Sequence, residues 1–395
     1  METQFCYGID AVTNQPVEVR FTEVISAVEP LLGKHTLTNY VAPGLIDIQI
    51  NGFAGVDYCS PYASTEDIAR SIRVLFSTGI TRFFPTVITG SVDGMAGAIR
   101  NLAKAKAALP LEGRAMEGFH IEGPHISPED GPRGAHPVEC VRPPDTAEFD
   151  RWMDLSDGHV KMVTVSPEWP QAPRYIEHVV RAGVVIAIGH TKATSAQIAD
   201  AIAAGATTST HLGNGAHADL PRHPNYIWDQ LAEDRLMASF IVDGVHLPAA
   251  FLKVALRAKG IERSVFTTDA VMPAGCTPGR YKLGEVEVEL HHPGDRVTLV
   301  GKDKLAGSSL RPDRGVENLM RLVGLSLMEA ITMSTRNPAR AGRVRARQRG
   351  LAAGERADII EFQFDQETKH IHIDTVYMDG EKVYSAASST RAATH

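Results

Sequence analysis

The chain has 395 residues, enough for one large enzyme domain with a small accessory domain, or for two to three ordinary domains. Hydrophobic residues make up 43% and charged residues 22% of the sequence, an ordinary globular composition that excludes extensive disorder. The net charge is -7, which argues against nucleic acid or an anionic membrane surface as the main partner.

Targeting signals and paired cysteines are absent from the sequence. The first residues, Met-Glu-Thr-Gln-Phe-Cys, lack the basic and then apolar layout of a signal peptide, and no stretch approaches the roughly twenty apolar residues of a membrane span. The four cysteines are scattered without a Cys-x-x-Cys pair, which argues against a disulfide framework and against a thiolate zinc site. We therefore expect a cytoplasmic protein with no membrane or nucleic-acid partner.

Both ends of the chain alternate between apolar and polar residues, as half-exposed strands do. Val17–Phe21 near the start and Ile371–Ile373 near the end show this pattern. The Asp379-Gly380 pair that follows favours a hairpin turn, because both residues tolerate positive φ. These patterns predict one small β-domain formed by both chain ends, from residues 1–41 and 356–395.

Between the two ends, short β-branched apolar segments alternate with amphipathic stretches. The first segment follows the breaker Pro43-Gly44 and ends at Ile50. Two amphipathic stretches begin with a polar cap, Ser64 or Thr194, as helices do. Further strands are predicted over 82–89, 115–121, 160–165, 184–188, 207–212, 238–242 and 264–268, and helices over 65–76, 91–108, 195–204 and 248–258.

This alternation predicts the fold. Nearly continuous apolar strands separated by helices are typical of a parallel sheet that is covered on both faces. Eight such units within residues 42–355 predict an α/β fold, a (β/α)8 barrel of the TIM type, whose usual size is about 250 residues before insertions. The structural alternative is a doubly wound open sheet, but no Gly-x-Gly-x-x-Gly follows the first strand.

Four of the predicted strands end in residues that can carry chemistry: Glu122, His190, His211 and Asp269. The active site of such a barrel forms where the C-terminal ends of the strands meet, so we expect these side chains to converge. Two imidazoles and a carboxylate can bind a divalent ion and leave an open position for water. Each residue alone has a structural explanation, such as hydrogen bonding or helix capping, but the four together indicate a hydrolytic Zn²⁺ site.

Eight short motifs cover nearly the whole chain: PGLIDIQING at 43–52, HIEGP at 120–124, GHTKAT at 189–194, THL at 210–212, DGVH at 243–246, TDA at 268–270, LAGSSL at 305–310 and NPAR at 337–340. In this order they resemble the N-acetylglucosamine-6-phosphate deacetylase family of the amidohydrolase superfamily. The resemblance implies that Glu122, His190 and His211 are metal ligands. It also implies that Asp269 is the catalytic acid and base.

The resemblance and the chemistry of the first strand together predict one metal ion. Many amidohydrolases carry a His-x-His pair at the end of this strand, whereas Gln49 and Asn51 stand there in this chain. Side-chain amides are poor ligands for divalent metals, and the fourth strand offers no Lys that could bridge two ions. We expect one divalent ion per chain and favour Zn²⁺, although the same ligands accept Fe²⁺, Co²⁺ or Mn²⁺.

Substrate contacts are also implied by the resemblance. Arg222 stands where the family binds a sugar phosphate, often across a dimer interface, and an Arg fork suits phosphate because it donates two parallel hydrogen bonds. His246 is implied as a second phosphate or sugar contact, and His136 as a catalytic loop residue that touches the sugar or the scissile carbonyl. Asn214 and Gly215 stand where the family offers amide groups. We therefore expect a homodimer that binds a small amino-sugar phosphate.

The loop after the sixth strand departs from the family. Many members have an aromatic residue and a Met there, whereas this chain has Gly213 and Ala216, followed by His217 and His223. The exact sugar therefore stays open. Our first hypothesis is the deacetylation of N-acetylglucosamine 6-phosphate, and the alternative is a related substrate such as N-acetylgalactosamine 6-phosphate. A non-catalytic scaffold is the third hypothesis, against which the complete set of four site residues argues.

Overall fold

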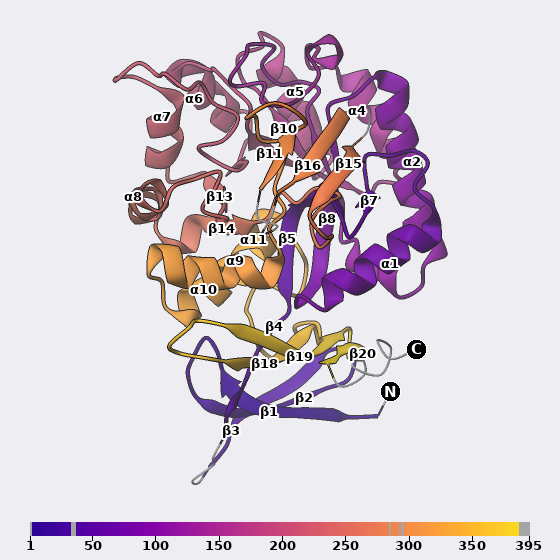
Figure 1. Ribbon diagram of the computed structural model, residues 1–395, viewed down its shortest axis with the longest axis vertical. Helices are drawn as coiled ribbons and strands as arrows, with labels where there is room; N and C mark the ends of the chain where they lie inside the picture. Colours follow the sequence, from indigo (N-terminus) through magenta and orange to yellow (C-terminus); the bar gives the residue numbers. More distant parts are fainter. Residues whose placement is uncertain (1, 33–36, 284–285, 292, 294–295, 387–395) are drawn as a thin grey trace.

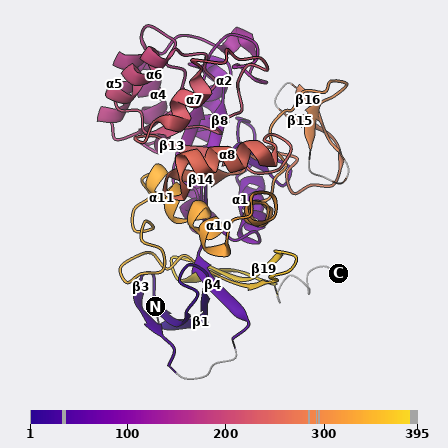
Figure 2. The same cartoon turned by 90° about the vertical axis from the view of Figure 1, so that its left-hand side faces the viewer.

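The computed structural model describes residues 2–32, 37–283, 286–291, 293 and 296–386. The chain forms a barrel and a second sheet, which lies below the barrel in Figures 1 and 2. None of the helices within the described residues is long and apolar enough to cross a membrane.

The barrel is one eight-stranded sheet in which each strand pairs in parallel with the next barrel strand along the chain. Its last and first strands meet at a bridge between Ala270 and Ile50. The expected (β/α)8 barrel is therefore confirmed. The strands are β5 (Leu45–Ile50), β8 (Ile80–Ile88), β9 (Phe119–Glu122), β10 (Val160–Val165), β11 (Val185–Ile188), β12 (Thr208–Ser209), β13 (Met237–Ile241) and β14 (Ser264–Thr267).

Helices connect these strands and cover the outside of the barrel (Figure 1). The Ser64 hydroxyl accepts from the Asp67 amide, and Thr194 forms a reciprocal capping box with Gln197, so both predicted helix starts are confirmed. The helices are α1 (Thr65–Phe76), α2 (Val92–Ala108), α3 (Glu112–Ala115), α4 (Thr146–Leu155), α5 (Ala172–Arg181), α6 (Ser195–Ala203), α7 (Tyr226–Ala232), α8 (Ala249–Lys259), α9 (Pro312–Asn318), α10 (Leu327–Ser334) and α11 (Arg336–Ala341), with short turns η1 (Val138–Cys140), η2 (Ile261–Arg263) and η3 (Leu319–Val323).

The second sheet joins the two ends of the chain, as expected. Its seven strands lie in the order β20-β19-β18-β4-β1-β2-β3, and Asp379 and Gly380 turn with φ of 48° and 75° between β19 and β20. Of the predicted β-domain, residues 1, 33–36 and 387–395 lie outside the described residues, and its boundaries stay a prediction. The strands are β1 (Gln4–Asp10), β2 (Pro16–Phe21), β3 (Ile25–Pro30), β4 (Asn39–Pro43), β18 (Ile359–Phe364), β19 (Ile371–Met378) and β20 (Glu381–Ser385).

Two smaller sheets were not expected from the sequence. A three-stranded antiparallel sheet, β15 (Gly279–Leu283), β16 (Val286–Leu290) and β17 (Val297–Leu299), projects from the barrel after β14 (Figure 2). It buries its own small apolar cluster, which includes Val288 and Val297. A two-stranded pair, β6 (Gly52–Phe53) and β7 (Val56–Asp57), follows β5.

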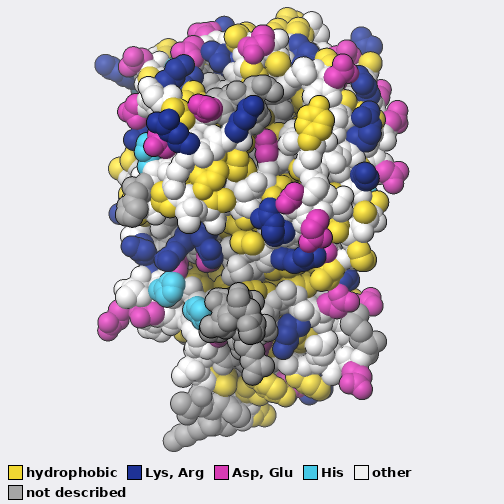
Figure 3. Space-filling model, turned by 45° about the vertical axis from the view of Figure 1, so that its right-hand side comes forward, with side chains coloured by type: hydrophobic (Ala, Val, Ile, Leu, Met, Phe, Trp, Pro, Cys, Tyr) yellow, Lys and Arg dark blue, Asp and Glu magenta, His cyan; other side chains and the backbone are white. Residues whose placement is uncertain are grey.

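Charged side chains of both signs lie interspersed over much of the face drawn in Figure 3. Many ion pairs are exposed, such as Arg70 with Asp67 and Arg181 with Glu177. Pairs of this kind contribute about 0–1 kcal/mol each, so they do not account for the attachment of the second sheet to the barrel.

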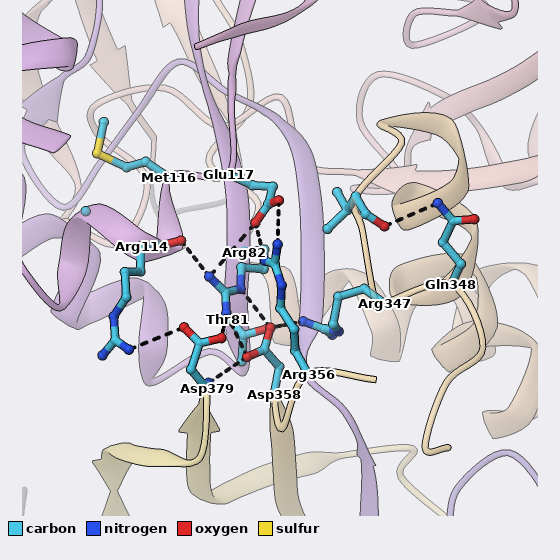
Figure 4. Close-up of polar contacts among 12 residues, drawn as sticks. Thr81, Arg82, Arg114, Met116, Glu117, Arg347, Gln348, Arg356, Asp358 and Asp379 are labelled. Atoms are coloured by element: carbon cyan, nitrogen blue, oxygen red, sulfur yellow. Dashed lines mark hydrogen bonds and ion pairs between the residues drawn. The ribbon is translucent and has the colours of Figure 1, made fainter. Parts of the chain in front are cut away.

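A buried ion network attaches the second sheet to the N-terminal end of the barrel (Figure 4). Arg82 on β8 binds both carboxylate oxygens of Asp358 at 2.7 and 2.9 Å, and Arg347 binds the same carboxylate. Arg82 also reaches Asp379 at 2.5 Å, and Arg347 donates to the Gly44 carbonyl. Burial alone would raise the pKa of Asp358, but the charges of Arg82 and Arg347 outweigh it and hold this pKa well below its usual range.

We expect Asp358→Ala to lower the free energy of unfolding by about 3–5 kcal/mol, because two buried guanidinium groups lose their shared partner. Urea denaturation of both proteins measures the difference. Since the folded-state pKa is lowered, the contribution is complete above the unfolded pKa and is lost only as the pH falls below about 4.

Asp374→Ala is the matched control, since this aspartate lies on β19 of the same sheet but is partly exposed and accepts one bond from Gln363. We expect it to cost less than about 1 kcal/mol. Equal costs for the two substitutions would contradict the assigned role of the buried network.

Candidate active site

Glu122, His190, His211 and Asp269 all lie at the C-terminal ends of the barrel strands; the first three are buried and Asp269 is half-buried. Three of them have left-handed backbone conformations that non-glycine residues rarely adopt, with φ of 50° at His190, 28° at His211 and 50° at Asp269. Such strain is typical of functional sites, where the surrounding structure fixes the residue. Each turn occurs directly after a strand and fixes the direction of the side chain.

Glu122, His190 and His211 present three ligand atoms to one another. Glu122 Oε1 lies 2.8 Å from His211 Nε2 and 3.3 Å from His190 Nε2, and the two Nε2 atoms are 3.1 Å apart. Atoms that each lie about 2.0–2.2 Å from one tetrahedral ion are about 3.3–3.6 Å apart. Each observed spacing is within roughly half an ångström of this range, so the three atoms fit one divalent ion.

The outer nitrogen of His190 is fixed by the protein. Its Nδ1 lies 2.8 Å from the carbonyl oxygen of Pro132, which can only accept, so Nδ1 carries the hydrogen and Nε2 keeps its lone pair. His211 Nδ1 is buried without a hydrogen-bond partner among the described residues, while its backbone amide donates to Ser239. Burial alone would raise the pKa of Glu122, but the contacts with His190 and His211 hold it well below its usual range.

His136 lies against the same cluster. Ligand atoms of Glu122, His136 and His190 all lie within 4.8 Å of one another, and the rings of His136 and His190 meet edge to face at 4.4 Å between centroids. His136 Nδ1 lies 2.7 Å from the Thr89 hydroxyl, and Nε2 points toward Glu122 Oε2 at 4.0 Å. Burial and then the charge of His190 lower the pKa of His136 to about 3, which makes it a neutral imidazole at neutral pH.

Gln49 and Asn51 connect two acidic groups of the site. Gln49 Nε2 donates to Glu122 Oε1 at 2.8 Å and to Asp269 Oδ1 at 3.0 Å, and Asn51 Nδ2 donates to Asp269 Oδ1 at 2.6 Å. Burial first, and then the charge of Glu122, raise the pKa of Asp269 to about 6, while the Asn51 bond opposes the rise. This value lies near the range in which a carboxyl group exchanges protons at neutral pH.

Asp47 is a site-supporting residue that we did not single out in the sequence. Its buried carboxylate accepts from the Gln49 amide at 3.0 Å, from the Thr267 hydroxyl at 2.6 Å, and from both the amide and the hydroxyl of Thr268. Asp47 thereby joins β5 to the end of β14, next to Asp269. A charged residue inside the apolar segment Leu45–Ile50 was the available signal, because a buried carboxylate needs several donors.

The loop after β12 carries Asn214 and Gly215, which line a hollow beside His190. A Cβ atom at Gly215, whose φ is 55°, would lie 2.6 Å from His190 Nδ1, so only glycine permits this close approach. A Cβ atom at Gly213 would lie 2.8 Å from the Phe251 ring. Phe251 on α8 thus occupies the space beside Gly213. The lack of an aromatic side chain at position 213, where many family members have one, therefore leaves no gap there.

Neither His246 nor Arg222 makes a hydrogen bond to the cluster among the described residues, although His246 lies near enough to Asp269 for its charge to lower the pKa of that carboxyl. His246 Nδ1 pairs with Asp243 at 2.5 Å, which leaves Nε2 as the second ring nitrogen for a ligand. Arg222 is exposed in the loop before α7, and within the described part of the chain its side chain makes no hydrogen bond or ion pair. The structure therefore brings together Glu122, His190, His211, Asp269 and His136, but it does not join Arg222 to them.

Comparisons with known proteins identify the family of this chain. Residues 40–383 match the model of the amidohydrolase family. The N-acetylglucosamine-6-phosphate deacetylase of Bacillus subtilis (strain 168) is 33% identical over 82% of this chain and 81% of its own length. The N-acetylgalactosamine-6-phosphate deacetylase of Escherichia coli O157:H7 is 30% identical over 91% of this chain and 92% of its own length.

Solved structures show the same fold. A variant N-acetyl-D-glucosamine-6-phosphate deacetylase from Mycobacterium smegmatis, in complex with N-acetyl-D-glucosamine-6-phosphate, has a TM-score of 0.87 and 28% identity, with 98% of this chain and 100% of that chain covered. The family model and the relatives each span most of the chain. This chain therefore belongs to the amidohydrolase family, in the group that contains the N-acetylglucosamine-6-phosphate deacetylases.

Proposed function

We propose that the protein hydrolyses the acetamido group of N-acetylglucosamine 6-phosphate to give glucosamine 6-phosphate and acetate. The observation that carries the proposal is the convergence of Glu122, His190 and His211 within 3.3 Å of one another, with Asp269 held beside them by Gln49. Relatives that bear the name of this activity match most of the chain.

Glu122, His190 and His211 are the proposed ligands of one divalent ion, for which we favour Zn²⁺. Their spacing and the lone pair left on His190 Nε2 support the fit, and two imidazoles with one carboxylate are typical of hydrolytic zinc sites. The positions of Gln49 and Asn51 support a single ion, because their amide groups already donate to the carboxylates of Glu122 and Asp269.

When bound, a divalent ion acidifies a water molecule and polarises the amide carbonyl of the substrate. The side-chain amides of Gln49 and Asn51 both donate their hydrogen bonds to Oδ1 of Asp269. We therefore assign the proton transfer to the other carboxylate oxygen, Oδ2. Asp269 accepts a proton from the attacking water as the new C–O bond forms, and donates it to the amine nitrogen as the C–N bond breaks. The products are acetate and the free amine.

His136 is proposed to stabilise the carbonyl oxygen as negative charge develops on it. This role requires a hydrogen on Nε2, and therefore that the Thr89 hydroxyl donates to Nδ1. The Thr89 hydroxyl oxygen lies 2.7 Å from His136 Nδ1 and 3.3 Å from the Glu122 carbonyl oxygen, so its single hydrogen can reach either acceptor, and the proposed role assigns it to Nδ1.

Arg222, His246, Asn214 and Gly215 are the proposed substrate contacts, with Arg222 and His246 on the phosphate. Binding energy from the phosphate would then position the acetamido group for attack. The exposed Arg222 side chain has no partner within the described residues, which is consistent with a role across the interface of a homodimer. We also propose a cytoplasmic location, where sugar phosphates are available.

N-acetylgalactosamine 6-phosphate is the second candidate substrate. The observations that favour it are the 30% identity to a deacetylase of that name and the unusual loop after β12. The two sugars differ only in configuration at one hydroxyl. A non-catalytic scaffold is the weakest hypothesis, because the four residues that the chemistry needs are all present and converge.

Acetate release tests the proposal directly. We expect purified, zinc-loaded protein to release acetate from N-acetylglucosamine 6-phosphate with a higher kcat/KM than from its galacto epimer or from either sugar without phosphate. A preference for the galacto epimer would support the second candidate. Failure to release acetate from any of the four sugars would contradict both.

Asp269→Asn is expected to lower kcat by about 10²–10⁴-fold, because the amide keeps the shape of the side chain but cannot accept a proton. Steady-state acetate release measures the loss, and metal content measured on the same sample should match the wild type. Near-normal turnover would show that another group activates the water.

Arg222→Ala is expected to lower kcat/KM on the phosphorylated sugar by roughly 10- to 150-fold, since each charged hydrogen bond contributes about 1.5–3 kcal/mol. Activity on the unphosphorylated sugar should be unchanged, because that substrate never makes the contact. Arg235→Ala is the control, since Arg235 is an exposed arginine that pairs only with Glu233 among the described residues. Equal losses on both substrates would mean that Arg222 supports the loop instead.

A further inference from the structure

His217, in the loop after β12, is a histidine that the resemblance leaves without a role. Its ring is fully engaged: Nδ1 lies 2.9 Å from the Tyr226 hydroxyl, and Nε2 lies 3.0 Å from Glu129 Oε1. The backbone amide of His217 donates to the same Tyr226 hydroxyl at 2.8 Å. Because both ring nitrogens have protein partners, His217 is not available to bind substrate and instead connects two segments of the chain.

The second segment is the Glu129 loop, which we define as residues 127–136 after β9. It packs closely on His217, since a Cβ atom at Gly131 would lie 3.1 Å from His217 Cα. The other carboxylate oxygen of Glu129 binds Lys192, two residues beyond His190. Glu129 therefore ties its loop to two neighbouring strand ends at once, through His217 and through Lys192.

The Glu129 loop also holds the outer side of the candidate metal site. Its Pro132 carbonyl is the oxygen that accepts from His190 Nδ1 at 2.8 Å. Its first residue, Ser127, donates a backbone hydrogen bond to the His190 carbonyl at 2.9 Å, and its last residue is His136. The position of this loop therefore sets the orientation of the His190 ring, and partners of this kind typically change metal affinity by about 10–100-fold when they are lost.

We propose that His217 is a positioning residue which, through Glu129, keeps the Pro132 carbonyl on His190 Nδ1 and so keeps His190 Nε2 directed at the metal position. The inference depends on the proposed function only in requiring that a metal binds there. It assigns to His217, within the divergent loop, a role in metal retention.

The test is the rate at which the zinc-loaded full-length protein releases zinc to a chromogenic chelator. We expect His217→Ala to release zinc about 10-fold faster than the wild type, at the lower end of the range for such partners. His217→Gln should release zinc more slowly than His217→Ala, because its terminal amide can still donate to Glu129.

His178→Ala is the matched control. His178 Nε2 pairs with Asp150 at 2.7 Å, and its side chain is 34% exposed, compared with 26% for His217, but the pair lies on the outer helices α4 and α5. Loss of this pair affects stability but does not alter the Glu129 loop. We therefore expect His178→Ala to release zinc at the wild-type rate. Glu129→Gln, which weakens both ties of the loop, is the second variant and should also accelerate release if His217→Ala does not fold.

Wild-type release rates in His217→Ala, or equal acceleration by His178→Ala, would overturn the proposal and leave the proposed function intact. If His217→Ala does not fold, a wild-type rate of zinc release in Glu129→Gln would also overturn the proposal. A wild-type chain that binds no zinc would overturn both the positioning role and the proposed metal site.

Discussion

The carboxylate of Glu122 is the group on which the arrangement of the site depends. A buried negative charge is costly unless several donors or a cation face it, and here His190, His211 and Gln49 all lie within 3.3 Å of Oε1. These partners come from the ends of β11 and β12 and from β5. The three strands must therefore pair in the correct register for all three side chains to reach the Glu122 carboxylate. Asp269 joins the same group from β14 through Gln49, which places a carboxyl of raised pKa beside the proposed metal position.

The two ends of the barrel have different physical tasks. At the N-terminal end, Arg82, Arg347 and Asp358 form a compensated ion network that attaches the second sheet. At the C-terminal end, the backbone is strained at the strand ends, and His211 Nδ1 has no partner among the residues that the structure describes. Local stability is thus sacrificed there for the geometry of a site. This division is common in barrel enzymes, in which the loops at the C-terminal face carry the chemistry.

The sequence was sufficient for the parts that depend on local patterns. The periodicity of apolar residues predicted the eight barrel strands, Ser64 and Thr194 marked the helix starts, and Glu122, His190, His211 and Asp269 were recognisable at strand ends. What it could not provide depends on distant contacts. The bonds of Gln49 to two carboxylates, the packing of Phe251 beside Gly213, and the bridge from His217 to Glu129 join residues that only the closed barrel brings together. The strand pairing of β15–β17 depends on a small apolar cluster that the local pattern did not reveal.

We propose that Glu122, His190 and His211 hold one metal ion. Anomalous diffraction from crystals of the zinc-loaded protein, recorded on both sides of the zinc edge, would locate that ion. We expect one anomalous peak per chain, about 2.0–2.2 Å from a Glu122 oxygen and from the Nε2 atoms of both histidines. The absence of a peak at this position, or a second peak of equal height beside Gln49 and Asn51, would show that the proposed ligand set is wrong.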